Sequence, residues 1–398
     1  MSRIVVIGAG IVGAATAREL ARAGHEVVVV ERSTAASGTS GRGEGNILVS
    51  DKGPGPELDL SLLSRGLWPA LVRELRAELP SDFPGIEFEP KGGLVVSTTD
   101  QGAQSLLAFA DRQRAVGVRA EVLERDEVLA LEPHLTERFT SAVLYPDDAQ
   151  VQPVIATEAF LASARLSGAR VLSSTRVVAG VRDTAGRIVG VRISGPRGEA
   201  RLDADHVVVA AGPWSAEVSA QLGAPIPVRP RRGMVLVTTR MPHRIRRKVY
   251  DADYVGAVGS SGEELQTSSV VESTAAGTVL IGSSREQVGF RDDFRAAIVA
   301  ELSRKAITLF PFLASASAMR SYSGFRPYMP DHLPMIGHDH RVAGLWHATG
   351  HEGAGIGLAP ATAVLLRAMI SGEPTPIDAS GFALERPTLQ PHLDEVAA

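Results

Sequence analysis

The chain has 398 residues, 44% hydrophobic and 22% charged, which is an ordinary globular composition with enough length for more than one average domain. Its 41 lysines and arginines are balanced by 45 aspartates and glutamates, and the net charge of -4 argues against nucleic acid as a partner. The absence of cysteine excludes disulfides, thiolate nucleophiles, iron–sulfur clusters and a flavin attached through sulfur.

The first 32 residues predict a strand, a glycine turn, a helix and a second strand. Residues 4–7 and 27–30 are continuous Val/Ile runs, typical of parallel strands buried on both faces, and Gly24 is placed to end the helix between them. The run at 4–7 is too short for a signal-peptide core, and no segment approaches the ~20 apolar residues of a membrane span. We therefore expect a cytoplasmic protein.

Later elements alternate between helical and extended patterns. A Gly/Ser/Pro-rich loop is expected at 33–56. Helices are expected at 58–79, 104–116 and 356–370, and strands at 92–97, 176–178, 207–210, 225–240, 249–258 and 265–283.

This order predicts an α/β fold with two interleaved domains. A Rossmann-like nucleotide-binding domain with a parallel sheet takes residues 1–85, 145–220 and 325–398. A mainly antiparallel substrate-binding domain takes residues 86–144 and 221–324.

The turn after the first strand carries a dinucleotide-binding pattern. In G-x-G-x-x-G, Gly8 makes the tight turn, Gly10 admits the pyrophosphate and Gly13 lets helix and strand pack closely. The helix N-terminus would offer unpaired N–H groups to phosphate, and Glu31 ends the second strand where an acid binds a ribose diol. The alternative is a purely structural turn.

A second glycine-rich segment, 37–46, bears on which dinucleotide binds. A nicotinamide enzyme does not usually need it, so it favours FAD. Its alternative interpretation is a flexible surface loop.

Four blocks together resemble the D-amino-acid oxidase / glycine oxidase family of FAD-dependent oxidoreductases over nearly the whole chain. They are residues 8–13 with Glu31 and Arg32, residues 207–215, residues 324–337, and residues 348–356. Within the family, residues 42–52 and 350–355 are most similar to catalytic subunits of opine, proline-type or glycine dehydrogenases, including hydrogen cyanide synthase.

The resemblance implies non-covalent FAD. The implied cofactor contacts are Gly8, Gly10, Ile11, Val12, Gly13, Glu31, Arg32, Thr39, Ser40, Glu44, Gly45, Asn46, Val177, Ala211, Gly212, Trp214, Gly350, His351, Glu352, Gly353, Gly355 and Ile356. The helix that starts near Gly355 would direct its positive end at the reduced flavin.

The resemblance also implies hydride transfer from the carbon beside nitrogen of a small amino or imino acid, without a side-chain base. Arg326 would bind the substrate carboxylate, although a surface salt bridge is its alternative interpretation. Tyr254 and Tyr250 would reach the substrate or else serve the core, and His351 would adjust the flavin or only bond locally. Glycine oxidases tend to carry a larger, basic side chain in the segment after the Gly-His pair, whereas here Glu352 is followed by Gly353, Ala354 and Gly355, so we expect a substrate bulkier than glycine.

Other functions remain open at this point. The chain would be a catalytic oxidase, a flavin subunit that passes electrons to partner subunits instead of oxygen, or a nicotinamide-dependent dehydrogenase. We expect an oligomer and no metal, with His332, His338 and His340 at the surface. The basic run 243–248 is expected to be a solvated loop, with an acidic docking partner as its alternative.

Overall fold

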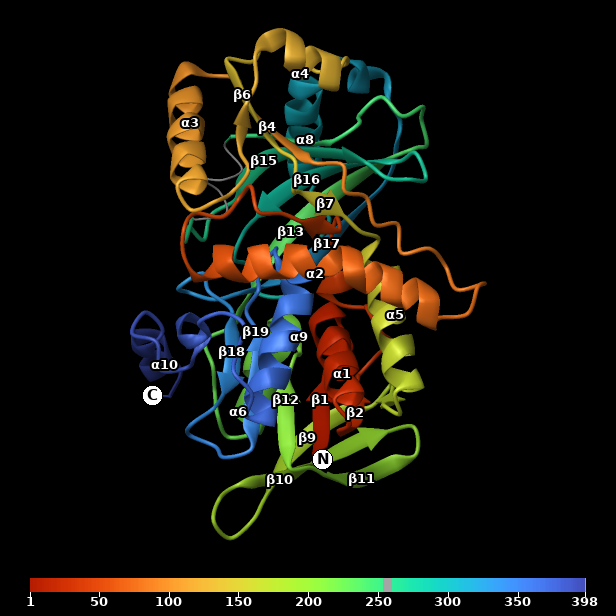
Figure 1. Ribbon diagram of the computed structural model, residues 1–398, viewed down its shortest axis with the longest axis vertical. Helices are drawn as coiled ribbons and strands as arrows, with labels where there is room; N and C mark the ends of the chain where they lie inside the picture. The colour runs from red at the N-terminus through yellow and green to blue at the C-terminus, as the bar shows by residue number, and fades with distance from the viewer. Residues whose placement is uncertain (253–259, 398) are drawn as a thin grey trace.

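The computed structural model describes residues 1–252 and 260–397. Its elements form a lower and an upper half, and the long helix α2 (Pro56–Glu78) crosses between them (Figure 1).

The lower half is built on a six-stranded sheet with the order β18-β19-β12-β1-β2-β8. Its strands are β1 (Arg3–Ile7), β2 (Glu26–Val30), β8 (Arg170–Leu172), β12 (His206–Val209), β18 (Met335–His338) and β19 (Leu345–Thr349). Neighbours pair in parallel except β18, which runs antiparallel to β19. The predicted parallel sheet is therefore confirmed.

Both faces of this sheet are buried, as its continuous apolar runs predict. Ile4 and Val6 pack in one core with the helices, while Val5 and Ile7 pack in another. The helices of the first face are α1 (Ile11–Arg22), α5 (Pro153–Leu166) and α9 (Gly355–Ser371), with α2 against them.

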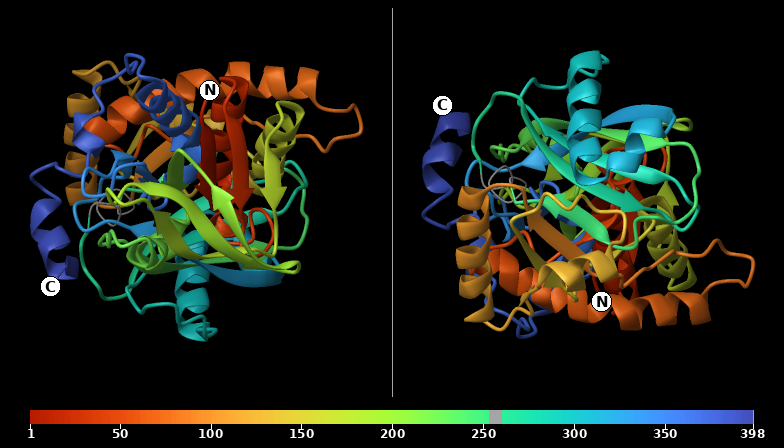
Figure 2. Two further views of the ribbon diagram at one scale, coloured as in Figure 1. Left: turned by 90° about the horizontal axis from the view of Figure 1, so that it is seen from below. Right: turned by 90° about the horizontal axis from the view of Figure 1, so that it is seen from above.

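A three-stranded antiparallel sheet covers the other face. It consists of β9 (Arg176–Arg182), β10 (Ile188–Gly195) and β11 (Gly198–Asp203), of which the sequence predicted only the start of β9. Val177, Val191 and Ile193 share a core with β1. In the left view of Figure 2, this sheet and α2 lie on opposite sides of β1.

The upper half is an eight-stranded, mainly antiparallel sheet with the order β17-β13-β16-β15-β14-β4-β6-β5. Its strands are β4 (Gly93–Ser97), β5 (Glu121–Val122), β6 (Ser141–Tyr145), β13 (Arg229–Thr238), β14 (Lys248–Asp251), β15 (Gln266–Ser273), β16 (Val279–Arg285) and β17 (Ala318–Tyr328). Helices α8 (Ala296–Leu309) and α4 (Arg125–Leu131) share one core with the sheet, and α3 (Asp100–Arg114) shares another.

Short elements complete the described chain. They are η1 (Thr39–Arg42), β3 (Asn46–Ile47), β7 (Ala149–Gln150), η2 (Gly212–Trp214), α6 (Ser215–Gln221), η3 (Pro311–Ser315), η4 (Ser380–Phe382) and α10 (Gln390–Ala397). Across the described ranges, none of the helices is both long and apolar enough to cross a bilayer.

The two large sheets draw their strands from the segments expected for the two domains, and we keep that division as a proposal. Strand β17 runs through the boundary expected at 324/325, because it pairs with β13 continuously from Arg320 to Tyr328. The extended pattern at 265–283 is two strands with a turn between them, and the pattern at 249–258 runs into residues 253–259, outside the described residues.

The solvated loop expected at 243–248 is wrong at its end. Lys248 begins β14 and is only 2% exposed, and Ile245 is buried in the upper core. The basic character of residues 243–248 predicts exposure of the whole run. Lys248 is buried nevertheless, because it pairs with β4 as the first residue of β14.

Candidate active site

A cavity of about 690 Å³ opens between the two halves, at the carboxyl ends of β1, β2, β12 and β19. In parallel α/β sheets this edge is where ligands bind, and the volume lies within the ~300–1,000 Å³ usual for ligand pockets. Its walls also include residues of β13 and β17, so both sheets contribute to the site.

The glycine turn has the backbone geometry that the motif requires. Gly8 has φ +111°, and a Cβ there would collide with the carbonyl oxygen of Ala210. A Cβ on Gly13 would collide with the carbonyl oxygen of Gly8, so α1 packs directly on the turn. Gly10 lines the cavity. A side chain at either Gly8 or Gly13 would close this cradle.

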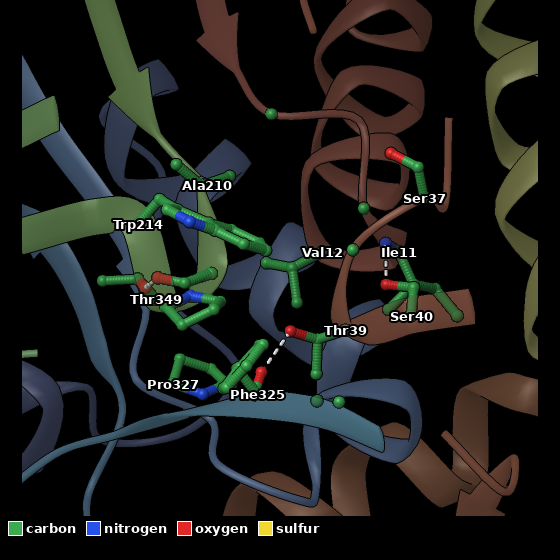
Figure 3. Close-up of a pocket in the computed structure, with 18 of the residues that line it drawn as sticks. Ile11, Val12, Ser37, Thr39, Ser40, Ala210, Trp214, Phe325, Pro327 and Thr349 are labelled. Atoms are coloured by element: carbon green, nitrogen blue, oxygen red, sulfur yellow. Dashed lines mark hydrogen bonds between the residues drawn. The ribbon is translucent and has the colours of Figure 1, made fainter. Parts of the chain in front are cut away.

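Two side chains hold the turn from the cavity side. Glu31 Oε2 accepts a hydrogen bond from Ala9 N at 2.9 Å, and its Oε1 accepts one from Ser33 N at 2.8 Å. Ser40 Oγ accepts from Ile11 N at 2.9 Å (Figure 3). The expectation of unpaired N–H groups is therefore wrong for the first amide of α1, because Ser40 already caps it. Each Glu31 oxygen keeps a second lone pair for a ligand hydroxyl.

The glycine-rich segment 37–46 lies on the cavity wall and joins the two halves. Thr39 Oγ1 donates to the carbonyl oxygen of Phe325 on β17 at 2.5 Å, a contact visible in Figure 3. Ser37, Gly38, Arg42 and Gly43 line the cavity as well. The alternative of a flexible surface loop does not describe this arrangement.

Glu44 and Asn46 form a polar corner of the wall. Asn46 Nδ2 donates to Glu44 Oε2 at 3.2 Å, and the buried Lys248 contacts Asn46 Oδ1 and lies 3.8 Å from Glu44 Oε2. Glu272, also fully buried, is 3.5 Å from Lys248 on the far side. Sequence reasoning missed this lysine because a basic run carries no sign of burial.

An aromatic stack closes the wall near Arg32 and Trp214. The Arg32 guanidinium lies 4.0 Å from the Trp214 ring, and Trp214 stacks on Phe290 with ring centres 5.3 Å apart and planes 8° apart. Phe290 in turn meets Phe325 edge to face. Phe290 was not predicted, and its only sequence signal is a large apolar side chain among charged neighbours.

Arg326 projects from β17 onto the cavity wall and is half-buried. Its Nη1 donates to the carbonyl oxygen of Ser284 at 2.9 Å. A Cβ on Gly233 of β13 would collide with its guanidinium, and a Cβ on Gly353 would lie 3.6 Å from its Nε. The glycine at 233 therefore leaves the room that this guanidinium occupies, while Gly353 lies in ordinary contact distance of it.

Glu352 lies beside Arg326 in a strained conformation, with φ +45°. Its Oε1 accepts from Nη1 of Arg231 at 2.7 Å, and its Oε2 is 3.7 Å from Nδ1 of His332. Burial alone would raise the pKa of Glu352, but His332 and the guanidinium groups of Arg231, Arg285 and Arg326 together hold it below its ordinary value. Glu352 is therefore a carboxylate at neutral pH.

His351 lines the cavity but turns its ring into the protein. Its Nε2 shares a 2.9 Å hydrogen bond with Thr362 Oγ1 of α9, and burial lowers the pKa of His351 to about 3. The imidazole is therefore neutral at physiological pH. Helix α9 starts four residues later at Gly355, and Gly355 and Ile356 both line the cavity.

Several predicted site residues lie elsewhere. Gly45 and Gly350 are not among the lining residues. A Cβ on Gly45 would collide with Val151 and a Cβ on Gly350 with Met329, so both glycines have a packing role. Tyr250 is buried behind the wall, where its hydroxyl bonds to Ser50, and Tyr254 lies outside the described residues.

Gly13 is not a lining residue either, and its role is to pack α1 on the turn. Besides His351, Gly355 and Ile356, the other predicted contacts line the cavity. These are Gly10, Ile11, Val12, Glu31, Arg32, Thr39, Ser40, Glu44, Asn46, Val177, Ala211, Gly212, Trp214, Glu352 and Gly353, together with Gly8 of the turn.

The three histidines near 335 have separate surroundings. His332 bonds to Ser261, His338 meets the ring of Trp346, and His340 pairs with Glu385. Only His332 approaches the cavity, through Glu352.

These residues fit a dinucleotide cofactor, since the cradle needs glycine at two positions, Glu31 faces the cavity, and one cavity joins the turn to Arg326. The family model described as FAD dependent oxidoreductase matches residues 3–369.

Two curated proteins and one solved structure illustrate the similarity. The chain is 29% identical to glycine oxidase of Geobacillus kaustophilus, over 96% of both chains. It is 31% identical to hydrogen cyanide synthase subunit HcnC of Pseudomonas aeruginosa, over 85% of this chain and 76% of that one. The crystal structure of the Geobacillus kaustophilus glycine oxidase superposes with a TM-score of 0.85 at 28% identity, covering 97% of this chain and 99% of the other.

Proposed function

Because the chain belongs to the family of FAD dependent oxidoreductases, we propose that it oxidises a small amino or imino acid at the carbon next to nitrogen. The observation that supports this proposal is the guanidinium of Arg326, held between Gly233 and Gly353 on the wall of the cavity that also contains the dinucleotide turn. A planar fork of donors at this place is suited to a substrate carboxylate.

FAD, when bound, supplies the acceptor for a hydride, and the turn at Gly8–Gly13, Glu31, Thr39, Ser40 and Val177 would hold it. The protein's part is to orient the substrate. Arg326 would fix the carboxylate so that the Cα–H bond has one allowed direction, and such positioning can contribute ~7–11 kcal/mol to a reaction. His351 is neutral and bonded to Thr362, so it adds no charge to the wall.

We further propose a substrate bulkier than glycine, such as a proline-like ring or an N-substituted amino acid. Gly353, Ala354 and Gly355 follow Glu352, so the wall beside Arg326 carries no large side chain in this segment.

The direct test is a panel of amino and imino acids added to the purified yellow protein without oxygen. Bleaching of the flavin absorbance by a proline-like or N-substituted amino acid, at lower concentration than by glycine, is the expected result. A flavin that no member of the panel reduces would contradict the proposed function, and preferential reduction by glycine would contradict only the bulkier substrate.

The electron acceptor divides the proposal into two forms. The similarity to a subunit of hydrogen cyanide synthase favours transfer to a partner subunit, whereas the similarity to glycine oxidase favours oxygen. Peroxide produced in air at the rate of substrate oxidation would identify an oxidase. Turnover only with an artificial acceptor would identify a dehydrogenase. The cytoplasmic location and the oligomeric state stay predictions.

A further inference from the structure

Glu352 lies on the cavity wall within electrostatic reach of Arg326, the proposed carboxylate anchor, and its backbone is held in a conformation that L residues rarely adopt. The φ of +45° costs energy, and such strain persists where the surroundings hold it in place. Here the amide of Glu352 donates to the carbonyl oxygen of Pro327, directly after Arg326, at 3.1 Å. The strained residue is thus tied to the strand that carries Arg326.

The carboxylate of Glu352 forms a salt bridge with Arg231, which is fully buried on β13. Arg231 donates through Nη1 to Glu352 at 2.7 Å and through Nη2 to the carbonyl oxygen of Ser260 at 2.8 Å, and its guanidinium lies 5.2 Å from the ring centre of Tyr328. Arg231 is also the direct cross-strand partner of Arg326. The β13–β17 register therefore places two guanidinium groups side by side, one paired with Glu352 and one on the cavity wall.

The wall consequently offers a cation and an anion next to each other. Glu352 keeps 15% of its side-chain surface exposed, and it lines the cavity together with Arg326 and the intervening Gly353. A zwitterionic α-amino acid carries a carboxylate and an ammonium group on the same carbon atom, so its charges complement this pair.

Building on the proposed function, we propose that Glu352 binds the substrate nitrogen and selects amino and imino acids against acids of the same shape that lack the amine. In the reaction, the Cα–H bond breaks with both electrons, which leave as hydride to the bound flavin. Before this step the bound ammonium group loses one proton to water, which leaves a neutral amine with a lone pair. That lone pair becomes the second C–N bond, and the nitrogen regains a positive charge as an iminium ion. Glu352 neither gives nor takes a proton in this step.

The interaction is electrostatic. The carboxylate faces the ammonium group when the substrate binds and the nitrogen again when its charge develops, while Arg231 and His332 keep Glu352 in place. Because Glu352 attracts the amine and repels a bare carboxylate, its charge should have opposite effects on ligands with and without nitrogen.

Two ligands of nearly identical shape separate these effects. 2-Aminoisobutyrate has no Cα–H bond and cannot be oxidised, and pivalate replaces its ammonium group by a methyl group. Each would be titrated into the FAD-loaded protein, and binding followed by the change in flavin absorbance. In the wild-type protein we expect 2-aminoisobutyrate to bind more tightly than pivalate.

The isosteric Glu352→Gln substitution keeps an oxygen for Arg231 and removes the charge. We expect it to weaken 2-aminoisobutyrate binding by about tenfold or more, the usual scale for a charge-assisted contact, and to leave pivalate binding unchanged or tighter. The matched control is Glu57→Gln, since Glu57 is close enough to interact electrostatically with Glu352 but is not among the described lining residues. It should change both affinities by less than about twofold.

The outcomes are distinguishable. Equal changes in both affinities after Glu352→Gln would mean that Glu352 is only a structural partner of Arg231 and would overturn the inference. Should this variant not fold, wild-type protein that binds pivalate as tightly as 2-aminoisobutyrate would overturn it as well. If neither ligand binds the wild type, while the amino-acid panel also fails, the proposed function itself fails.

Discussion

Replacing Arg326 by alanine should abolish substrate recognition while leaving the cofactor bound. Arg326 donates to the main-chain carbonyl oxygen of Ser284, and its guanidinium lies against Gly233 on the cavity wall, away from the glycine turn. The glycine turn, Glu31 and Ser40 are unaffected by the substitution. We therefore expect the FAD content and the visible spectrum of Arg326→Ala to match those of the wild type.

The kinetic loss follows from the contact that disappears. A charge-assisted pair between a guanidinium and a carboxylate in a site that excludes water contributes ~2–5 kcal/mol when one partner is removed. At ~1.4 kcal/mol per factor of ten, kcat/KM should fall by about 30-fold to 4,000-fold. Arg326→Lys keeps the charge but loses the planar fork, so it should fall between the alanine variant and the wild type.

The assay is anaerobic stopped-flow reduction of the flavin by the best member of the amino-acid panel. Arg320→Ala is the matched control, because Arg320 lies on the same strand but is exposed, and it should retain wild-type rates. An Arg326→Ala variant within about threefold of the wild type would remove Arg326 from substrate binding, since that change is worth less than ~0.7 kcal/mol.

Three further outcomes are expected. Gly13→Val should yield protein without FAD, because the valine side chain would collide with the carbonyl oxygen of Gly8 in the turn. Its control is Gly66→Val on α2, where a Cβ meets open space, and that variant should bind FAD and stay yellow. Phe290→Ala should speed FAD dissociation, measured by flavin fluorescence, roughly 2- to 12-fold through loss of the stack on Trp214, and an unchanged rate would show that the stack does not retain the cofactor. For His351, burial lowers the pKa to about 3, so the unfolded chain takes up a proton below pH 6.5 while the native protein does not. Stability is therefore lost as the pH falls from 6.5 towards 3, by about 2 kcal/mol at pH 5, and urea unfolding at pH 7.5 and 5 should show a smaller difference for His351→Gln than for the wild type.

Local spacing in the sequence was enough to predict the dinucleotide half of the site. The glycine turn, the helix after it and Glu31 lie within the first 31 residues, and each has a steric or hydrogen-bonding role that depends on near neighbours. Gly8 and Gly13 could be interpreted correctly because the positive φ of Gly8 and the close approach of Gly13 to the carbonyl oxygen of Gly8 both arise within the turn itself. The long apolar runs also predicted strands buried on both faces.

The substrate half depended on pairings between residues far apart in the chain. Arg231 becomes the neighbour of Arg326 only through the β13–β17 register, and it reaches Glu352 across 121 residues of sequence. The burial of Lys248 likewise depends on the pairing of β14 with β4. A charged side chain is stable in such places only when the fold brings it a partner, and no local pattern shows that partner. The sequence by itself therefore determined where the cofactor's phosphates are expected, whereas tertiary structure decided which charges lie on the cavity wall.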